Sequence, residues 1–350
     1  MKKKILLLSP GLDQAIAIAR YIKKYSDSFE LYGGYLPQEN PIKNKRLFAK
    51  CFEIKDKRLL NHFDLVLPTG TVSTKWLLSS LDSIRVGEIT FLKDNLQCFD
   101  KLSLLKRVAD LSIPIPETYT DTDQAESRFP LFYKAKHEKI TDLRGIAFSK
   151  RDIDEINEVD KVFFQELIPT KSTYGMGFLV KNGKLVASFQ HEETLSCPIQ
   201  GGSAVIIKRY YNQRIEEYTK KIIGSLGYEG WGLVEYKFCP KRNDFVFMEI
   251  NAKFWASIEF TFINDNSFFN HLFKVSYANQ LIHRLVFIDR LAVLGVGCFF
   301  KNALHLVGSR IVAYHGFFQV LKSLIAPLIP NKIKKTRNKT GNGFVIRKKH

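Results

Sequence analysis

One short segment, residues 244–257, constrains the fold of this chain more than any other. It reads DFVFMEINAKFWAS, and its first half has the aromatic and β-branched content of a buried strand. The two predicted faces of this strand are Val246, Met248 and Ile250 on one side, a core face, and Phe245, Phe247, Glu249 and Asn251 on the other. A carboxylate and an amide therefore emerge side by side from an apolar strand. A glutamate is rarely buried without a partner, since removing its charge from water costs free energy.

The preceding predicted strand, GLVEY, carries a second such glutamate, Glu235. Two carboxylates and one amide oxygen on neighbouring strands suit a hard cation such as Mg²⁺, which prefers a few oxygen ligands together with phosphates. Glu235, Glu249 and Asn251 are therefore the candidate metal ligands. The pattern leaves an alternative open, in which both glutamates stand at strand ends in water.

Lys134 is a further polar residue in an apolar strand, because it follows the run LFY directly. A lysine in this position either extends its ammonium group to the surface or meets a buried anion such as a phosphate. The pattern alone leaves both open. Lys101, which follows Asp100 at a predicted helix start, is by itself ordinary surface chemistry.

The first 95 residues alternate strand, helix and strand. The predicted elements are strands at 4–9, 29–32 and 63–67 and a helix at 15–25. The chain turns at Pro10-Gly11, and the second and third strands end at Gly33-Gly34 and Pro68-Thr69-Gly70. This alternation predicts a small parallel α/β domain over residues 1–95. The apolar run Ile5–Leu8 is shorter than the roughly 7–15 residues of a secretory core segment, so it indicates a buried strand and not a signal peptide.

The middle of the chain is richer in strands. Helices are predicted at 100–111 and 214–226, and strands at 129–135, 161–169, 230–238 and 244–254, with a hairpin at 177–189 that turns at Asn182-Gly183. With 350 residues, the chain is long enough for two or three domains.

Taken in order, these segments resemble the ATP-grasp superfamily, and most closely its carbamoyl-phosphate-synthase-like and amino acid ligase-like members. The resemblance runs from about residue 60 to 265 and rests on the motifs DNLQCFDKLSLLKRVADLSIPIPETY, FPLFYKA, VFFQELIP, GLVEYKF and VFMEINAKFWAS. MEINAKFWAS is the strongest, because it matches the superfamily's Glu-x-Asn metal strand and the small loop after it.

The resemblance implies an α/β and α+β protein of ATP-grasp fold with four parts. These are a Rossmann-like pre-ATP-grasp domain (1–95), the small subdomain (96–160), the large subdomain with the Mg-ATP site (161–279), and a basic, amphipathic helical extension (280–350).

The resemblance also implies a nucleotide site. Lys101 and Lys134 would contact the phosphates of ATP. Gln165 to Ile168 would form the hinge between the two subdomains, with the backbone near Glu166 and Leu167 bonding the adenine edge.

The metal and substrate positions follow in the same way. Glu235, Glu249 and Asn251 would hold one or two Mg²⁺ ions, and Lys253 stands where the superfamily usually has an arginine that contacts the transferring phosphoryl group. The loop IQGGSA, residues 199–204, matches one that shapes the substrate pocket. Its relevant members are Gly201, Gly202 and Ser203, which allow close backbone approach and a hydroxyl hydrogen bond.

Three departures from the superfamily pattern are visible. The ribose-binding position, seven residues after the hinge glutamate, is usually acidic but is Thr173 here. The loop expected over the phosphates is HEKITDLRG, with one glycine, Gly145, and with Lys139 and Arg144 as charged residues. Lys253 keeps the charge of the usual arginine but loses its bidentate fork.

The reaction implied is an ADP-forming ligation of a small-molecule carboxylate to an amine through an acyl phosphate, with lysines and Mg²⁺ neutralising the phosphoryl charge. Such an enzyme would suit the building of cell-surface polysaccharide or peptide conjugates. One alternative is a non-catalytic nucleotide-binding regulatory module. A second is a sugar-nucleotide glycosyltransferase, which predicts another parallel-sheet domain after residue 160 where this sequence has a hairpin.

Net charge is concentrated at the C-terminal end. The chain carries +18, and residues 281–350 hold thirteen Lys/Arg and one Asp. No uncharged run in this stretch reaches the roughly 18–20 residues that span a bilayer. Residues 281–330 could pack on the body, form a dimer contact, or lie in a membrane interface with Lys332 to Lys339 on anionic headgroups. Nucleic acid binding by the segment NKIKKTRNK is disfavoured, because no base-reading module accompanies it.

The cysteines indicate the compartment. Five cysteines occur at scattered positions without a CxxC motif, which is typical of reduced cysteines in a cytoplasmic protein. The expected location is therefore the cytoplasm, with peripheral attachment at the inner membrane face if the tail binds lipid.

Overall fold

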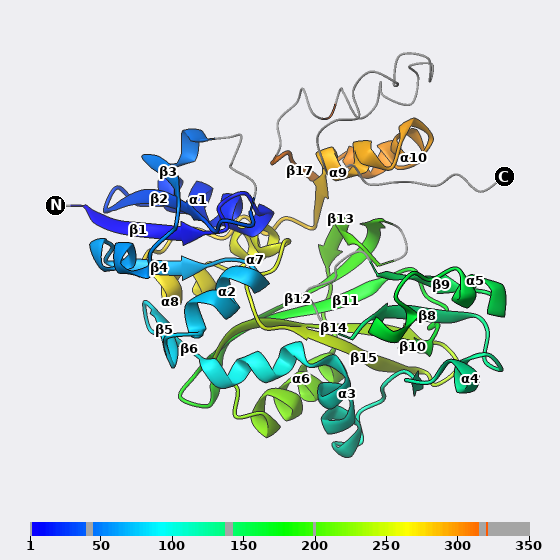
Figure 1. Cartoon of the computed structure of the whole chain (residues 1–350). Helices are drawn as coiled ribbons and strands as arrows, with labels where there is room; N and C mark the ends of the chain where they lie inside the picture. The colour runs from blue at the N-terminus through cyan, green and yellow to red at the C-terminus, as the bar shows by residue number, and fades with distance from the viewer. Residues whose placement is uncertain (1, 40–44, 137–142, 199–200, 315–319, 321–350) are drawn as a thin grey trace, which may run out of the picture.

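The computed structural model describes residues 2–39, 45–136, 143–198 and 201–314, together with Val320. Within these ranges the chain forms a parallel sheet, a small antiparallel sheet, a large seven-stranded sheet and a hairpin (Figure 1). Lys139, Ile199, Gln200 and the basic segment Lys332 to Lys339 lie outside the described residues.

The N-terminal sheet is parallel, with strand order β3-β2-β1-β4. Its strands are β1 (Lys3–Leu8), β2 (Phe29–Tyr35), β3 (Lys50–Glu53) and β4 (Leu65–Pro68), accompanied by α1 (Asp13–Tyr25), α2 (Thr71–Leu78) and the 3-10 turns η1 (Lys45–Leu47) and η2 (Lys57–His62). The apolar run Ile5–Leu8 is fully buried in the middle of this sheet. It is therefore a core strand, as its sequence predicts.

The predicted end of the second strand at Gly33-Gly34 is wrong, because β2 continues through both glycines to Tyr35. A Cβ atom at Gly33 would lie 2.8 Å from Cys51 Sγ in β3, and one at Gly34 would lie 2.8 Å from Ile54. The two glycines therefore serve the close approach of β3, a strand that the apolar pattern missed.

A hairpin and a helix connect the N-terminal sheet to the rest of the chain. They comprise β5 (Ser83–Val86), β6 (Ile89–Leu92), η3 (Lys93–Phe99) and α3 (Lys101–Asp110). Phe91 of β6 packs against Trp231 of the large sheet, with ring centroids 4.9 Å apart. The side chain of Asp100 caps α3 by accepting a hydrogen bond from the backbone of Ser103, and this fixes where Lys101 begins the helix.

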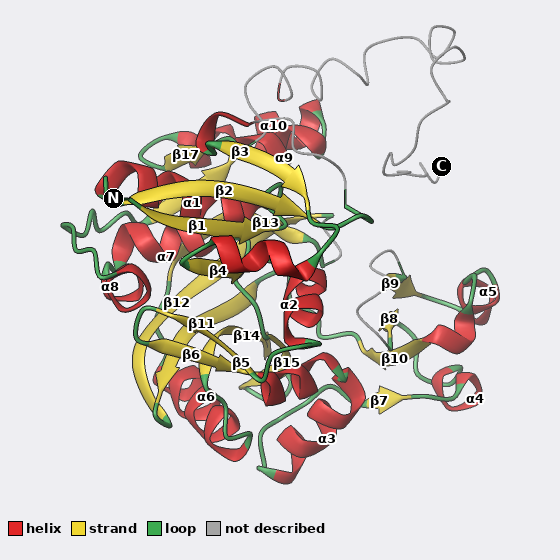
Figure 2. Ribbon diagram, turned by 60° about the vertical axis from the view of Figure 1, so that its left-hand side comes forward, coloured by secondary structure: helices red, strands yellow, loops and turns green. Residues whose placement is uncertain are grey.

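The small sheet has strand order β7-β10-β8-β9 and a core of its own. Its elements are β7 (Thr118–Tyr119), β8 (Leu131–Ala135), β9 (Arg144–Ala147), β10 (Val162–Glu166), α4 (Thr122–Ala125), α5 (Lys150–Asp154) and η4 (Val159–Lys161). Leu131, Val162 and Phe164 form the centre of this separate core. Figure 2 shows the small sheet with α4 and α5 set to one side of the body.

The large sheet has the order β15-β14-β11-β12-β13-β16-β17. Its main elements are β11 (Thr173–Lys181), β12 (Lys184–Cys197), β13 (Ser203–Arg209), β14 (Gly230–Cys239), β15 (Asp244–Asn251), α6 (Gln213–Ser225), α7 (Ile258–Asn264) and α8 (Ser267–Phe273). Asn182 and Gly183 both have positive φ, the geometry expected of the predicted hairpin turn. Every described strand pair after residue 160 is antiparallel except β16–β17, so the glycosyltransferase alternative loses its structural basis.

The segment after residue 280 is only partly helical. It contains β16 (Arg284–Phe287), α9 (Ile288–Val293), α10 (Val296–Lys301), η5 (Ala303–Leu306) and β17 (Arg310–Val312). β16 pairs with β13 and β17 pairs with β16, so the described part of the predicted helical extension also completes the large sheet. In the described ranges, no helix combines the length and the apolar character that crossing a bilayer requires.

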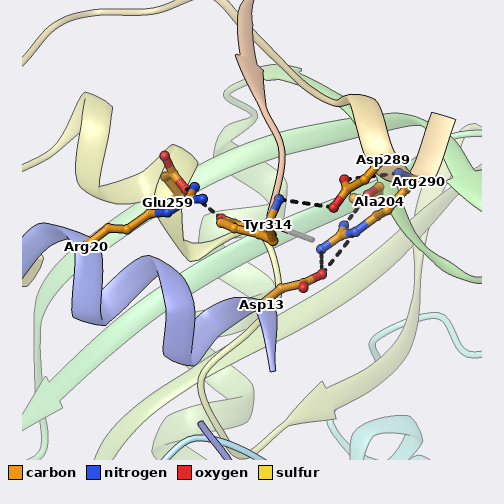
Figure 3. Close-up of polar contacts among 7 residues, drawn as sticks. All are labelled: Asp13, Arg20, Ala204, Glu259, Asp289, Arg290 and Tyr314. Carbon is orange, nitrogen blue, oxygen red and sulfur yellow. Dashed lines mark hydrogen bonds and ion pairs between the residues drawn. The ribbon is translucent and has the colours of Figure 1, made fainter. Parts of the chain in front are cut away.

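A buried polar network attaches this C-terminal segment to the body (Figure 3). Arg290 pairs with Asp13 at the start of α1 and also donates to the backbone oxygen of Ala204 in β13. The backbone N–H of Tyr314 donates to Asp289 at 3.0 Å. Three segments far apart in the sequence are therefore joined at one place.

The second half of the network joins Tyr314 to α7 and α1. The Tyr314 hydroxyl donates to Glu259 Oε2 at 2.6 Å, and Arg20 lies 3.9 Å from the same oxygen. Arg20 also donates to the backbone oxygen of Ala313. Burial raises the pKa of Glu259, and the Tyr314 hydroxyl and Arg20 oppose that rise.

Replacing Tyr314 with Phe is expected to lower the free energy of unfolding by about 1–3 kcal/mol, because it leaves a buried carboxylate without its hydroxyl partner. The loss should shrink as the pH falls through the raised pKa of Glu259, since the protonated group carries no charge to compensate. Tyr211→Phe is the control: its exposed hydroxyl donates to Glu216 at 3.0 Å, and the variant should unfold like the wild type. Equal stabilities of the two variants in urea titrations would contradict the role of Tyr314.

Candidate active site

A register shift between β14 and β15 sets the geometry of the candidate site. Glu235 lies opposite Glu249, but the next residue, Tyr236, lies opposite Phe247, so Met248 is an extra residue in β15. Such a bulge reverses the alternation of faces. The prediction that Phe245 and Phe247 share a face with Glu249 is therefore wrong.

The core contacts follow the bulge. Phe245, Phe247 and Ile250 belong to the main core, whereas Val246 and Met248 join a small cluster with Ile168 and Cys239. The predicted core face of Val246, Met248 and Ile250 is thus split between two clusters. The neighbouring positions of Glu249 and Asn251, and their closeness to Glu235, are unaffected by this correction.

Glu235, Asn251 and Lys253 form a chain of hydrogen bonds. Asn251 Nδ2 donates to Glu235 Oε1 at 2.9 Å, and Lys253 Nζ donates to Asn251 Oδ1 at 3.0 Å. All three side chains are half-buried. The amide of Asn251 is therefore held between an acidic and a basic group.

Glu249 faces two lysines that come from other parts of the chain. Its Oε2 lies 3.6 Å from Lys101 Nζ, on the first residue of α3, and 3.9 Å from Lys134 Nζ, on β8 of the small sheet. Lys134 also donates to the backbone oxygen of Met248, the bulged residue, at 3.4 Å. Lys134 is buried, so its ammonium group meets an anion and does not extend to the surface.

The pKa values of this cluster are strongly perturbed. Burial alone would raise the pKa of Glu249, but Lys101, Lys134 and Lys253 outweigh it and hold that pKa well below its usual range. Burial, followed by the charges of Glu249 and Glu193, raises the pKa of Glu235. Burial lowers the pKa of Lys134 to about 8.

A family model described as "Carbamoyl-phosphate synthase L chain, ATP binding domain" matches residues 196–261, which include β14, β15 and the loop after them. No curated protein sequence matches the chain.

Several solved structures are similar to the chain. N5-carboxyaminoimidazole synthetase from Staphylococcus aureus, complexed with ADP, has a TM-score of 0.62 and 14% identity over 87% of each chain. L-amino acid ligase from Bacillus licheniformis has a TM-score of 0.59 and 11% identity, covering 81% of this chain and 78% of that one. Pyruvate carboxylase from Rhizobium etli has a TM-score of 0.58 and 13% identity, and although 76% of this chain is covered, it spans only 28% of that protein.

These similarities each cover 76–87% of this chain. The chain has the ATP-grasp fold. Identities of 11–14% establish the fold alone.

In this ATP-grasp fold, the predicted hinge Gln165 to Ile168 leaves the end of β10 and enters the large subdomain. Gln165 is fully buried, its amide nitrogen donates to Thr118 Oγ1 at 3.1 Å, and its Oε1 has no hydrogen-bond partner within the described part of the chain. The backbone N–H of Glu166 is already bonded to Glu117, at 2.8 Å, and its carboxylate pairs with Arg242 in the β14–β15 turn. An orphaned acceptor beside the hinge fits a donor such as an adenine amino group.

The loop predicted to shape the substrate pocket is described from Gly201 onward. Gly201 has φ +97°, and a Cβ atom there would lie 3.5 Å from Phe132 of the small sheet. A Cβ atom at Gly202 would lie 2.0 Å from the Cys197 backbone, so only glycine fits this position. Ser203 opens β13 opposite Cys197 and is exposed. The loop therefore reaches the small subdomain at the edge of the site.

Three residues near this site were missed by the sequence analysis. Gly175 in β11 lies between Glu235 on one side and His191 on the other, and a Cβ atom there would lie 2.7 Å from the His191 ring. His191 is buried, 3.5 Å from Glu193 and 3.4 Å from the hydroxyl of Ser257. The alternation of His191 and Glu193, just beyond the predicted hairpin that ended at residue 189, is the signal that could have found them. Glu193 also lies opposite Thr173, the departure at the ribose position.

The candidate metal ligands of this site are the side-chain oxygen atoms of Glu235, Glu249 and Asn251. No group of three His, Cys, Asp or Glu side chains with metal-binding geometry occurs among the described residues. The site instead offers two carboxylates and one amide oxygen, which suits a cation that keeps water and phosphate ligands, as Mg²⁺ does. The residues present therefore fit Mg²⁺.

Proposed function

We propose that this chain is an ATP-dependent ligase that activates a small-molecule carboxylate as an acyl phosphate and transfers it to an amine. The observation that carries the proposal is the convergence of Glu235, Glu249 and Asn251 with two lysines from other segments. Lys101 and Lys134 both lie within 4 Å of Glu249. A merely structural salt bridge needs one lysine, whereas a polyphosphate needs several positive groups together.

The lysines and the oxygen ligands act on the same anion in this proposal. Lys101 and Lys134 bind phosphate oxygens of ATP and neutralise negative charge as the γ-phosphoryl group moves. Glu235, Glu249 and Asn251 would hold Mg²⁺, which supplies further neutralisation when bound. Because Lys134 belongs to the small subdomain and Glu249 to the large one, both subdomains hold one phosphate chain.

The hinge binds the base in this proposal. The free Oε1 of Gln165 accepts from the adenine amino group, and the backbone of Leu167, which forms no hydrogen bond within the described ranges, bonds the adenine edge. Ile168 lies in the apolar cluster with Val246 and Met248 and provides a buried surface under the base. Thr173 lies beside the ribose of ATP in this proposal.

The transfer itself requires an acid in line with the γ-phosphoryl group. The carboxylate oxygen of the substrate attacks phosphorus, ADP leaves, and the acyl phosphate is then attacked by an amine with release of phosphate. Lys253, which donates to Asn251, contacts the moving phosphoryl group in this proposal. Gly201, Gly202 and Ser203 line the acceptor side, and Arg144, whose charge lowers the pKa of Glu249, provides a further positive group.

The setting we propose is the cytoplasm, at the inner face of a membrane, in the synthesis of a cell-surface polymer or peptide conjugate. The support is the basic, apolar C-terminal region, with thirteen Lys/Arg and one Asp in residues 281–350.

The test is ADP release from Mg-ATP, screened against pools of amino acids, sugar acids and amines. We expect release that depends on one acid pool and one amine pool together, and that stops when EDTA removes Mg²⁺. A nucleotide-binding regulatory module would bind Mg-ATP by calorimetry and release no ADP with any pool, and that result would reject the ligase proposal.

A further inference from the structure

Exposed apolar side chains are concentrated in one short stretch of the chain. Of the eleven large apolar side chains that are exposed in the described chain, five lie between residues 293 and 311. The three most exposed of all are Phe300 (71%), Leu304 (85%) and Val307 (77%), and Ile311 follows at 48%. Single exposed apolar residues are normal, but a cluster of this kind marks an interaction site.

The same stretch carries only positive charge. After Asp289 the sequence contains no Asp or Glu to its end, and twelve Lys or Arg residues. In the described part, Lys301 and Arg310 are exposed beside the apolar side chains. We use the name docking surface for Phe300, Lys301, Leu304, Val307, Arg310 and Ile311.

The docking surface belongs to a segment that is firmly packed on the body. On the inner side, Leu291, Cys298, Phe299 and Leu306 pack with Val205 and Ile206 of β13. The network around Arg290 and Tyr314 fixes both ends of the segment to α1, β13 and α7 (Figure 3). Figure 1 shows α9 and α10 as the outermost elements beyond β13. Phe300 and Leu304 are therefore held outward by packing on the inner side.

We infer that the docking surface binds an anionic phospholipid membrane. Apolar side chains flanked by lysine and arginine match the two layers of such a membrane, with acyl chains below and negative headgroups above. A second copy of the chain is disfavoured as the occupant, because it would bring two exclusively basic segments together. An RNA is disfavoured because the most exposed groups, Leu304 and Val307, are aliphatic and contribute nothing to phosphate contacts.

The inference deepens the proposed setting, but it does not depend on ligase activity. The ATP site is built from β8, α3, β14 and β15, and none of these elements contributes to the docking surface. Vesicle binding and ADP release can therefore be measured separately on the same protein.

The experiment is sedimentation of the full chain with vesicles of phosphatidylcholine, alone or mixed with phosphatidylglycerol. We expect binding to the mixed vesicles only, weakened by added salt. The double variant Leu304→Asn/Val307→Asn leaves the charge unchanged. Its affinity for the mixed vesicles should fall by about tenfold or more, because two aliphatic side chains are lost from the apolar contact. The matched control is Phe148→Asn/Tyr211→Asn, which removes two similarly exposed residues (64% and 69%) elsewhere and should bind like the wild type.

Four results would overturn the inference. They are no vesicle binding by the wild type, equal binding of neutral and mixed vesicles, equal binding by the Leu304/Val307 variant, and a change of that variant from dimer to monomer in light scattering. RNA binding that weakens in the same variant would assign the surface to nucleic acid instead. ADP release without vesicles should be the same in all variants, so a failed ligase assay leaves the vesicle result interpretable.

Discussion

Glu249→Gln is expected to lower turnover by about 10³-fold or more while the protein stays folded. Glutamine lacks the negative charge of glutamate but has nearly the same shape, so packing in β15 is preserved. Loss of a metal-binding carboxylate removes several kcal/mol of stabilisation from phosphoryl transfer, and each 1.36 kcal/mol corresponds to tenfold in rate. We expect a large loss of turnover at this position because Glu249 faces both Lys101 and Lys134.

Calorimetry distinguishes a metal ligand from a general electrostatic effect. The wild type should bind ATP more tightly when Mg²⁺ is added. In the Glu249→Gln variant that gain should disappear, whereas ATP binding without Mg²⁺ should persist, because both lysines remain. Glu216→Gln is the control, since Glu216 is partly buried and paired with Lys220 on α6, away from the site. A Mg²⁺ response of normal size in Glu249→Gln would remove the metal assignment.

Much of the candidate site could be predicted from the sequence because its residues are charged or polar at positions where the surrounding strand is apolar. Glu235, Glu249 and Lys134 are ionisable residues inside apolar strands, and burial of charge is costly enough that such residues need partners. The structure brings these three together with Asn251 and Lys101. Their order along the chain, in recognisable motifs, also predicted the fold correctly.

The parts that sequence could not supply depend on register and on distant contacts. The bulge at Met248 is a property of the β14–β15 pair, and alternation within β15 alone assigned Phe247 to the wrong face. The strand β16 is stabilised by pairing with β13, about 80 residues earlier, so its apolar sequence looked equally compatible with a helix. Contacts such as Asp13 with Arg290 join residues that no local pattern connects.

The His191 and Glu193 positions illustrate an intermediate case. Their alternation is visible in the sequence just after the predicted hairpin, but the reason for the placement of His191 is Gly175 on the neighbouring strand, which leaves room for the imidazole ring. Single-strand periodicity identifies a face and does not identify what lies across the next strand. A prediction of cross-strand pairs from the Asn182-Gly183 turn outward would have placed Gln190 beside Gly175, because the pairing shifts by one residue between Val180 and Leu179 and only that shift brings His191 opposite Gly175.

Lys134→Met is expected to lower kcat/KM for ATP by about 10²–10³-fold, the usual effect of removing one preorganised charged donor from a transition state. Methionine fills the space of the lysine stem, so the contact with Phe163, whose ring lies 5.4 Å from the ammonium group, is retained as an apolar contact. The structural reason for the large effect is that Lys134 is buried and directed across the subdomain boundary to Glu249. The charge therefore acts without screening by water.

Lys136→Met is the matched control for this variant. Lys136 lies two residues further along the chain, but its ammonium group donates to the backbone oxygen of Asp160 at 2.7 Å, away from Glu249. We expect its ATP kinetics to match the wild type. In Lys134→Met, unlike Glu249→Gln, the affinity for ATP should fall both with and without Mg²⁺, while the gain on adding Mg²⁺ remains, because the oxygen ligands are intact. If Lys134→Met and Lys136→Met bind ATP equally well, Lys134 is a structural partner of Glu249 and the phosphate-binding role passes to Lys101 alone.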